Sequence, residues 1–339
     1  MKKRLLIGLV LLLSAAALVV AGGQGAAKEG YVIGLSNFSL GNSWRVQMVE
    51  EAKFAAEQNS DLVRELIVTE AEGSVEKQIS DIEDLIAKKV DAILITAANP
   101  KALVPVVDKA MNAGVVVVDF DNLVYTDNVT AHVIVDQKEF GRVQGEWLVK
   151  VLDGEGEIIA FNGIKGTAIS AERFEGAKSV FDEYPDVTIV QEVYADWDYA
   201  KAKRAMENLL AAYPKIDGVW SQGGAMSEAV VEAYLERGEC PPPVTGEDGN
   251  GFLKIWKETQ ETCPGWDSIS TSMPTWCSAK AMEVALDALE GKKVDKEIFI
   301  PIPTITSATL DEYVKPDLPD SFWCNSKLPE ERVKKMFER

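Results

Sequence analysis

The stretch YVIGLSNFSLGNSWRVQ, residues 31–47, decides the fold. Its apolar start has the length and β-branched content of a buried strand. A polar loop follows, and Trp44 then opens a segment whose apolar residues recur at helical spacing. Asn42 and Ser43 are both suited to cap the first turn of that helix. The stretch therefore predicts a strand, a loop and a helix, in that order.

The loop of this unit carries side chains that can bind a ligand. Asn37, Phe38, Asn42, Trp44 and Arg45 lie within nine residues, and in open α/β sheets small ligands bind where such loops leave the carboxyl ends of strands. Amides, a cation and flat rings together favour a neutral, polyhydroxylated ligand. A helix cap and a core aromatic residue would account for the same residues without a ligand, so the loop alone does not decide.

The charge balance restricts the class of partner. The 339 residues include 35 Lys and Arg against 54 Asp and Glu, a formal net charge of −19. So acidic a surface argues against nucleic acid and anionic lipid as partners, because both need clustered basic residues. The length predicts about two domains.

The N-terminus has the order of regions found in a secretory signal peptide. Basic residues at positions 2–4 precede an apolar run and then small residues, AGGQGAA. We expect residues 1–27 to be removed, with cleavage after Ala21 or Ala27. A retained membrane anchor is the alternative, but the run is shorter than the roughly 20 apolar residues of a span. The mature protein is predicted to be exported, to the periplasm or the outer face of the cytoplasmic membrane.

The four cysteines all lie in the exported part. Outside the cytosol an even number favours disulfides, and we predict the pairs Cys240–Cys263 and Cys277–Cys324. Four buried free thiols are the alternative. With no CxxC pattern and His132 as the only histidine, no metal site is expected.

The rest of the chain repeats the strand–loop–helix order. Residues 115–120, VVVVDF, are typical of a strand covered on both faces in a parallel sheet. Strands alternating with helices indicate right-handed βαβ units, and their number exceeds one comfortable sheet. The sequence therefore predicts an α/β protein with two Rossmann-like lobes. The Pro-rich tail from residue 304 is expected to follow the surface and to end in a short helix from Pro329.

The motifs of common enzymes are absent. The sequence has no GxSxG, Walker A or GxGxxG pattern, and a single histidine leaves little for a catalytic pair. We therefore expect no enzyme activity and no cofactor. A glycosidase needs two positioned acids, and Asp119 with Asp121 or Asp248 leave that alternative open.

Polar and aromatic residues recur at the carboxyl ends of the predicted strands. Each could instead cap a helix, pack in the core or form a surface ion pair. Their recurrence at the same end of successive strands predicts a shared ligand site. The candidate ligand-binding residues are Asn42, Trp44, Arg45, Thr96, Asp119, Asp121, Arg173, Trp197, Gln222 and Asp248.

Six motifs stand out for their order and spacing: SNFSLGNSWRVQM (36–48), DLIAKKVDAILI (84–95), GVVVVDFDN (114–122), GIKGTAISAERFEGA (163–177), ADWDYAKA (195–202) and VTGEDGNG (244–251). Together they resemble the type I periplasmic sugar-binding proteins of the ribose-binding-protein-like branch, which supply ABC importers.

The resemblance implies a ligand clamped between two lobes joined by three crossing strands, near Val135, Ser272 and Ile302. The lobes would comprise residues 31–135 with 273–302, and residues 136–272 with 303–339.

The resemblance also implies roles for individual residues. Asp119, Arg173 and Asp248 match charged side chains that bind sugar hydroxyls in the family, and Trp197 replaces an aromatic residue that stacks on the sugar. The sequence departs from the family at Gly223, where Asn or Asp is usual, and at Ser272, where a Gln is common. The ligand is therefore not restricted to ribose.

We expect a monomeric solute-binding protein that captures a monosaccharide or related polyol and delivers it to an ABC-type permease. A sugar sensor that presents its closed form to a membrane receptor would share these features. A lactose-repressor-type regulator would need an N-terminal helix-turn-helix, whereas this chain begins with the predicted signal peptide. A sugar-active enzyme is the remaining alternative.

Overall fold

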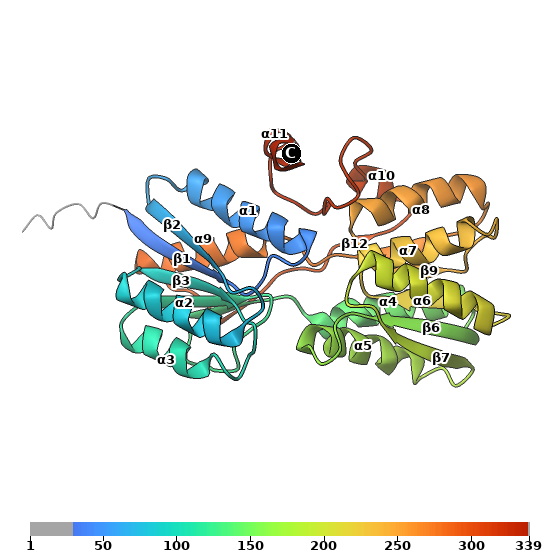
Figure 1. Ribbon diagram of the computed structural model, residues 1–339, viewed down its shortest axis with the longest axis horizontal. Helices are drawn as coiled ribbons and strands as arrows, with labels where there is room; N and C mark the ends of the chain where they lie inside the picture. Colours follow the sequence, from blue (N-terminus) through green and yellow to red (C-terminus); the bar gives the residue numbers. More distant parts are fainter. Residues whose placement is uncertain (1–29, 338–339) are drawn as a thin grey trace, which may run out of the picture.

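Two six-stranded β-sheets with helices on both faces make up the part of the chain that the computed structural model describes, residues 30–337 (Figure 1). The predicted signal peptide, residues 1–27, lies outside the described residues. Among residues 30–337, no helix combines the length and the apolar character that crossing a membrane requires.

The first sheet and its helices form what we call the first lobe. Its elements are β1 (Tyr31–Asn37), α1 (Ser43–Gln58), β2 (Val63–Glu70), α2 (Val75–Ala87), β3 (Ala92–Thr96), α3 (Val104–Asn112), β4 (Val116–Phe120), β5 (Ala131–Ile134), α9 (Cys277–Leu289) and β11 (Glu297–Phe299). The sheet is parallel throughout, in the order β11-β5-β4-β3-β1-β2. Helices α1 and α9 pack on one face and α2 and α3 on the other (Figure 1), which explains the apolar character of β4.

The second lobe repeats this arrangement. Its elements are α4 (Gln137–Val151), β6 (Gly156–Asn162), α5 (Ala168–Phe181), β7 (Val187–Tyr194), α6 (Tyr199–Ala212), β8 (Gly218–Ser221), α7 (Gly224–Leu235), β9 (Val244–Glu247), α8 (Asn250–Thr262), β10 (Ser268–Thr271), β12 (Thr304–Ile305) and α10 (Leu310–Tyr313). The strand order is β12-β10-β9-β8-β6-β7. Only β12 runs antiparallel to its neighbour among these strands.

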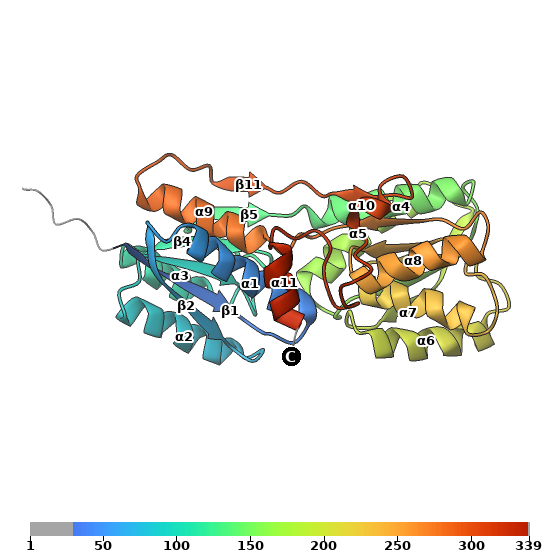
Figure 2. The same ribbon diagram turned by 90° about the horizontal axis from the view of Figure 1, so that it is seen from above.

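The chain passes between the two sheets at three places: from β5 to α4, from β10 to α9, and from β11 to β12. Backbone hydrogen bonds connect these segments, from Ile300 N to Ile134 O at 2.8 Å and from Ser272 N to Pro303 O at 3.1 Å. Figure 2 shows the segments running side by side between the lobes. Parallel strands of both sheets can therefore direct their carboxyl ends to the same region.

The edge strand β2 was not predicted from the sequence. It pairs only with β1, and most of its side chains are exposed or half-buried. Its sequence, VRELIVTE, mixes charged and apolar residues because one edge and much of its surface lie open.

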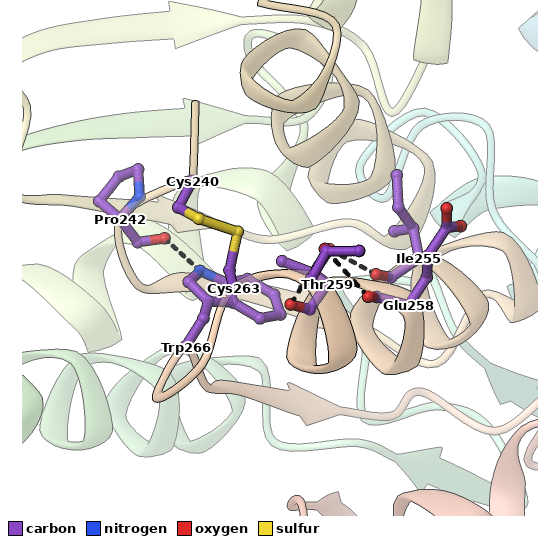
Figure 3. The surroundings of a disulfide bond; sticks show 8 residues. Cys240, Pro242, Ile255, Glu258, Thr259, Cys263 and Trp266 are labelled. Atoms are coloured by element: carbon purple, nitrogen blue, oxygen red, sulfur yellow. Dashed lines mark hydrogen bonds between the residues drawn. A yellow bond between two sulfur atoms is a disulfide. The ribbon is translucent and has the colours of Figure 1, made fainter. Parts of the chain in front are cut away.

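The predicted disulfide between Cys240 and Cys263 is present (Figure 3). It joins the loop after α7 to the end of α8, beside the Trp266 indole, which donates to Pro242 O. The predicted pair Cys277–Cys324 is wrong, because both thiols are free and buried. Cys277 packs in the core of the first lobe and Cys324 in that of the second.

The tail ends in α11 (Glu330–Phe337), which begins one residue after the predicted start at Pro329. Before that helix the tail leaves the second lobe and reaches α1 of the first (Figures 1 and 2). It therefore contacts both lobes rather than the second alone.

Candidate functional site

A cavity of about 110 Å³ lies between the lobes, at the carboxyl ends of strands from both sheets. Its lining comes from the loops after β1, β4, β7, β8 and β10, from the end of β9, from the first turns of α1, α5 and α7, and from the tail. The residues are Asn42, Ser43, Trp44, Arg45, Asp121, Ile169, Arg173, Trp197, Gly223, Gly224, Ala225, Glu247, Met273 and Trp323. A wider hollow of about 390 Å³ shares Asn42, Arg45, Ile169 and Trp197 with it.

The first lobe contributes an ion pair to the cavity. Asn42 caps α1 by accepting a hydrogen bond from Arg45 N at 3.0 Å, which places Arg45 in the first helical turn. One guanidinium nitrogen of Arg45 lies 2.7 Å from Asp121 Oδ2, and its plane lies 3.8 Å from the ring centre of Phe38. Thr96 also donates to Asp121 Oδ2, at 2.7 Å.

The second lobe contributes a matching ion pair. Arg173, on α5, lies 3.1 Å from Glu247 Oε1 and 3.7 Å from the ring centre of Phe140. It also donates to Gln137 Oε1 at 2.8 Å and to Gln222 O at 2.9 Å. Burial raises the pKa of Glu247, and the neighbouring Arg173 opposes that rise.

Each lobe thus holds an arginine between a carboxylate and a phenyl ring. The four charged side chains are nearly inaccessible and balance one another, so the cavity has no net formal charge from these groups. A charged ligand would leave an uncompensated charge in this buried setting, which is unfavourable. The arrangement favours an uncharged ligand that both donates and accepts hydrogen bonds.

Three indole rings line the same cavity: Trp44, Trp197 and Trp323. The N–H of Trp44 donates to Met273 O at 2.8 Å, and that of Trp323 donates to Ser43 Oγ at 3.0 Å. The buried N–H of Trp197 has no hydrogen-bond partner within the described chain. Trp197 alone among the three therefore offers both a ring face and a free donor to a ligand.

Two glycines make room for Trp197. A Cβ at Gly163 would lie 2.2 Å from Cε2 of the indole, and a Cβ at Gly223 would lie 2.5 Å from Cδ1. Gly223, where the sequence departs from the pattern of the family that it resembles, therefore leaves the space that the Trp197 ring fills. Trp197 itself has a φ of 55°, an uncommon conformation for a bulky residue.

Of the candidate residues, the structure brings Asn42, Trp44, Arg45, Asp121, Arg173 and Trp197 to the cavity. Thr96 and Gln222 lie behind it. Thr96 holds Asp121. The side chain of Gln222 donates to Asn162 and Ser170, and its carbonyl holds Arg173.

Asp119 does not line the cavity. It lies opposite His132 in the register of β4 and β5, and its Oδ1 is 2.6 Å from His132 Nδ1. Its Oδ2 accepts from Val124 N at 2.7 Å. The carboxylate that faces the cavity is Asp121, whose φ of 60° turns its side chain out of the strand direction.

Asp248 also lies outside the lining. Its Oδ2 accepts from Asn325 N in the tail at 2.8 Å, and burial raises its pKa to about 7, with the adjacent charge of Glu247 as the next cause. The preceding residue, Glu247, lines the cavity in its place. Glu247 and Asp248 are consecutive acidic residues, and the sequence alone does not show which of them faces the cavity.

Sequence reasoning also missed Ile169, Met273 and Trp323. Met273 lies on a segment that crosses between the lobes, and its sulfur is 3.5 Å from an Arg173 nitrogen. Trp323 belongs to the tail, which the sequence assigned to the surface. Within residues 30–337 no cluster of His, Cys, Asp or Glu suited to a metal ion occurs.

The chain matches the family model described as periplasmic binding protein domain over residues 33–293. It is 29% identical to the ribose import binding protein of Bacillus subtilis over 276 residues, 81% of this chain and 87% of that protein. It is 26% identical to the xylitol-binding protein of Mycolicibacterium smegmatis over 250 residues, 73% and 70% of the two chains.

A similar solved structure is that of an ABC transporter solute binding protein from Bacillus halodurans with bound myo-inositol. The TM-score is 0.76 at 26% identity, covering 85% of this chain and 99% of that one. The chain therefore belongs to the periplasmic binding protein family. The resemblance to type I periplasmic sugar-binding proteins and the predicted two-lobed α/β fold are both confirmed.

Proposed function

We propose that this protein is an extracytoplasmic solute-binding protein that captures a monosaccharide or related polyol between its lobes and delivers it to an ABC-type permease. The observation that carries the proposal is the pair of neutralised arginines, Arg45 and Arg173, in one cavity with three indole rings. The relatives named for ribose and xylitol, and the similar structure with myo-inositol, support a neutral polyhydroxylated ligand.

The energetics are adequate for such a ligand. A dissociation constant of 1 μM requires about −8 kcal/mol. Hydrogen bonds from a hydroxyl to charged groups contribute about 1.5–3 kcal/mol each, and Arg45, Asp121, Arg173 and Glu247 supply these groups. Contact of the ligand's C–H face with an indole adds apolar burial at about 25 cal/mol per Å².

Closure of the lobes is the proposed mechanism of capture. A ligand that contacts Arg45 in the first lobe and Arg173 in the second stabilises the conformation in which both reach it. The lobes would turn about the three crossing segments, residues 135–136, 272–274 and 300–303. No step breaks a covalent bond, so the ligand is expected to be released unchanged.

A thermal-shift screen of the mature protein against pentoses, hexoses, inositols and linear polyols tests the proposal. A ligand at 100 times its dissociation constant should add about 2.7 kcal/mol of stability. Titration calorimetry would then give the affinity, and chromatography of the recovered ligand would test for turnover. Stabilisation by none of these compounds, or conversion of one of them, would contradict the proposal.

A further inference from the structure

The C-terminal tail is built into both lobes. We call residues 315–337 the strap, since they run from the second lobe, just after α10, to α1 of the first (Figures 1 and 2). The strap passes the cavity between these two attachments, where Trp323 joins the lining.

The second lobe holds the start of the strap through Asn250. The amide of this buried side chain donates to the carbonyls of Lys315 and Leu318 at 2.8 and 3.0 Å and accepts from Lys315 N at 2.9 Å. Further on, Asp248 O accepts from Cys324 N at 3.0 Å. These bonds fix the backbone on both sides of Trp323.

The first lobe holds the strap through two buried residues on one side of α1, Gln47 and Glu51. The Gln47 amide donates to Trp323 O at 2.9 Å and accepts from Trp323 N at 3.0 Å. Glu51 Oε1 accepts from Ser326 Oγ at 2.7 Å and from Lys327 N at 3.0 Å. Both side chains are fully buried, so without the strap much of their hydrogen bonding would be lost at a substantial energetic penalty.

Trp323 is the residue that these attachments position. Gln47 of the first lobe bonds its N–H and its carbonyl. The second lobe bonds the residues on either side of it, from Asn250 N to Phe322 O and from Cys324 N to Asp248 O, which places Trp323 opposite Gly249. Its indole N–H donates a hydrogen bond to Ser43 Oγ. The ring can therefore present only carbon atoms to the cavity, as a rigid apolar wall.

We propose that Trp323 is a specificity-determining residue, and that the strap holds its ring as a wall that limits the size of the ligand on the strap side of the cavity. The proposal rests on the proposed sugar-binding function and adds the source of its size limit. A saccharide that extends toward the strap would enter the space that the ring occupies, and the double attachment of the strap prevents the ring from moving aside. The wider hollow that shares Asn42 and Trp197 with the cavity does not include Trp323, so the limit applies on the strap side.

The test compares Trp323→Ala and Trp323→Phe with wild type, using the best monosaccharide or polyol from the screen and a disaccharide that contains the same unit. Trp276→Ala is the matched control. Trp276 also contacts the strap, through a bond from its N–H to Asn325 at 3.2 Å, but it does not line the cavity. Circular dichroism and unfolding curves check that each variant folds.

Trp323→Ala should weaken binding of the small ligand at least about tenfold and lower its preference over the disaccharide by a similar factor, the range for a changed apolar wall. Trp323→Phe, which retains a ring and most of the packing, should lie between it and wild type. Trp276→Ala should retain the wild-type preference.

An unchanged affinity and size preference in folded Trp323→Ala or Trp323→Phe would overturn the role of Trp323 while leaving sugar binding intact. An equal change in Trp276→Ala would also overturn it, since the effect would then come from the strap as a whole. A wild-type protein that binds no compound of the panel would instead overturn the proposed function.

Discussion

Gly163→Ala should displace Trp197 from the cavity and weaken ligand binding strongly. Gly163 lies directly after β6, and a Cβ there would meet Cε2 and Cζ2 of the indole at 2.2 Å. Carbon atoms in favourable contact are about 3.5–4.0 Å apart, so the ring would have to move by more than about 1 Å. Movement of the ring toward Gly223 is blocked as well. Cδ1 of the indole is already so close to this glycine that a Cβ built on it would lie 2.5 Å away.

The expected loss follows from what Trp197 offers the ligand. A tryptophan buries roughly 150–250 Å², and contact through one face accounts for roughly 80 Å², or about 2 kcal/mol at 25 cal/mol per Å². The N–H of Trp197, which has no partner within the described residues, adds about 1 kcal/mol if it donates to the ligand. The sum of about 3 kcal/mol corresponds to roughly a hundredfold in affinity.

The assay is titration calorimetry on wild type, Gly163→Ala, Trp197→Ala and the double variant. If the glycine acts only by making room for the indole, Gly163→Ala has no further effect once the ring is absent. The two losses are then strongly non-additive, with a coupling energy of about 3 kcal/mol, at the upper end for residues in contact.

Gly249→Ala is the control for adding a methyl group near the site. The nearest atom to its Cβ would be the Cα of Gly224, at 3.6 Å, an ordinary contact. Its affinity should stay within about threefold of wild type. Wild-type affinity in Gly163→Ala, or additive losses in the double variant, would refute the reasoning.

Three further predictions concern Arg173, the disulfide and Asp248. Arg173→Ala should weaken binding at least about tenfold, because one charge-assisted hydrogen bond exceeds the 1.4 kcal/mol of a decade; an unchanged affinity by calorimetry would remove Arg173 from the site. Cys263→Ser should lower the free energy of unfolding by about 3 kcal/mol, since the bond to Cys240 closes a loop with a sequence separation of 23; urea unfolding at the wild-type midpoint would contradict this. Burial raises the pKa of Asp248 from 3.8 to about 7, so the folded protein keeps a proton that the unfolded chain loses. The associated stability, of the order of 4 kcal/mol at 1.36 kcal/mol per unit, is present below about pH 4 and lost as the pH rises to about 7. Asp248→Asn should flatten that decrease in urea unfolding measured across this range, and a wild-type slope would be the contrary result.

Local patterns were sufficient to predict most of the fold. Apolar runs such as residues 115–120 became buried central strands because helices cover both faces of their sheets. The Asn42 cap and the start of α1 also followed from residue types alone. β2 was not predicted, because an exposed edge strand needs no continuous apolar run and its sequence pattern therefore resembles that of a loop.

The sequence predicted which loops contribute to the candidate site, but not which side chains of those loops face the cavity. In the pair Asp119 and Asp121, which carboxylate faces the cavity depends on a positive φ at Asp121 and on His132 opposite Asp119. Neither appears in the local sequence. The same holds for Glu247 and Asp248, since the tail captures Asp248 through Asn325, 77 residues further along the chain.

The positions of the ion pairs bear on how the lobes can move. Arg45 pairs with Asp121 inside the first lobe and Arg173 with Glu247 inside the second. Separating the lobes therefore breaks neither pair, and each empty half-site remains neutral in water. Because neither pair joins one lobe to the other, these two ion pairs do not stabilise the closed form of the ligand-free protein. The difference in free energy between open and closed forms then depends on the attachments of the strap to the two lobes and on contacts that a bound ligand makes with both lobes at once. Only the second contribution changes with the ligand, which is the condition for closure to report binding.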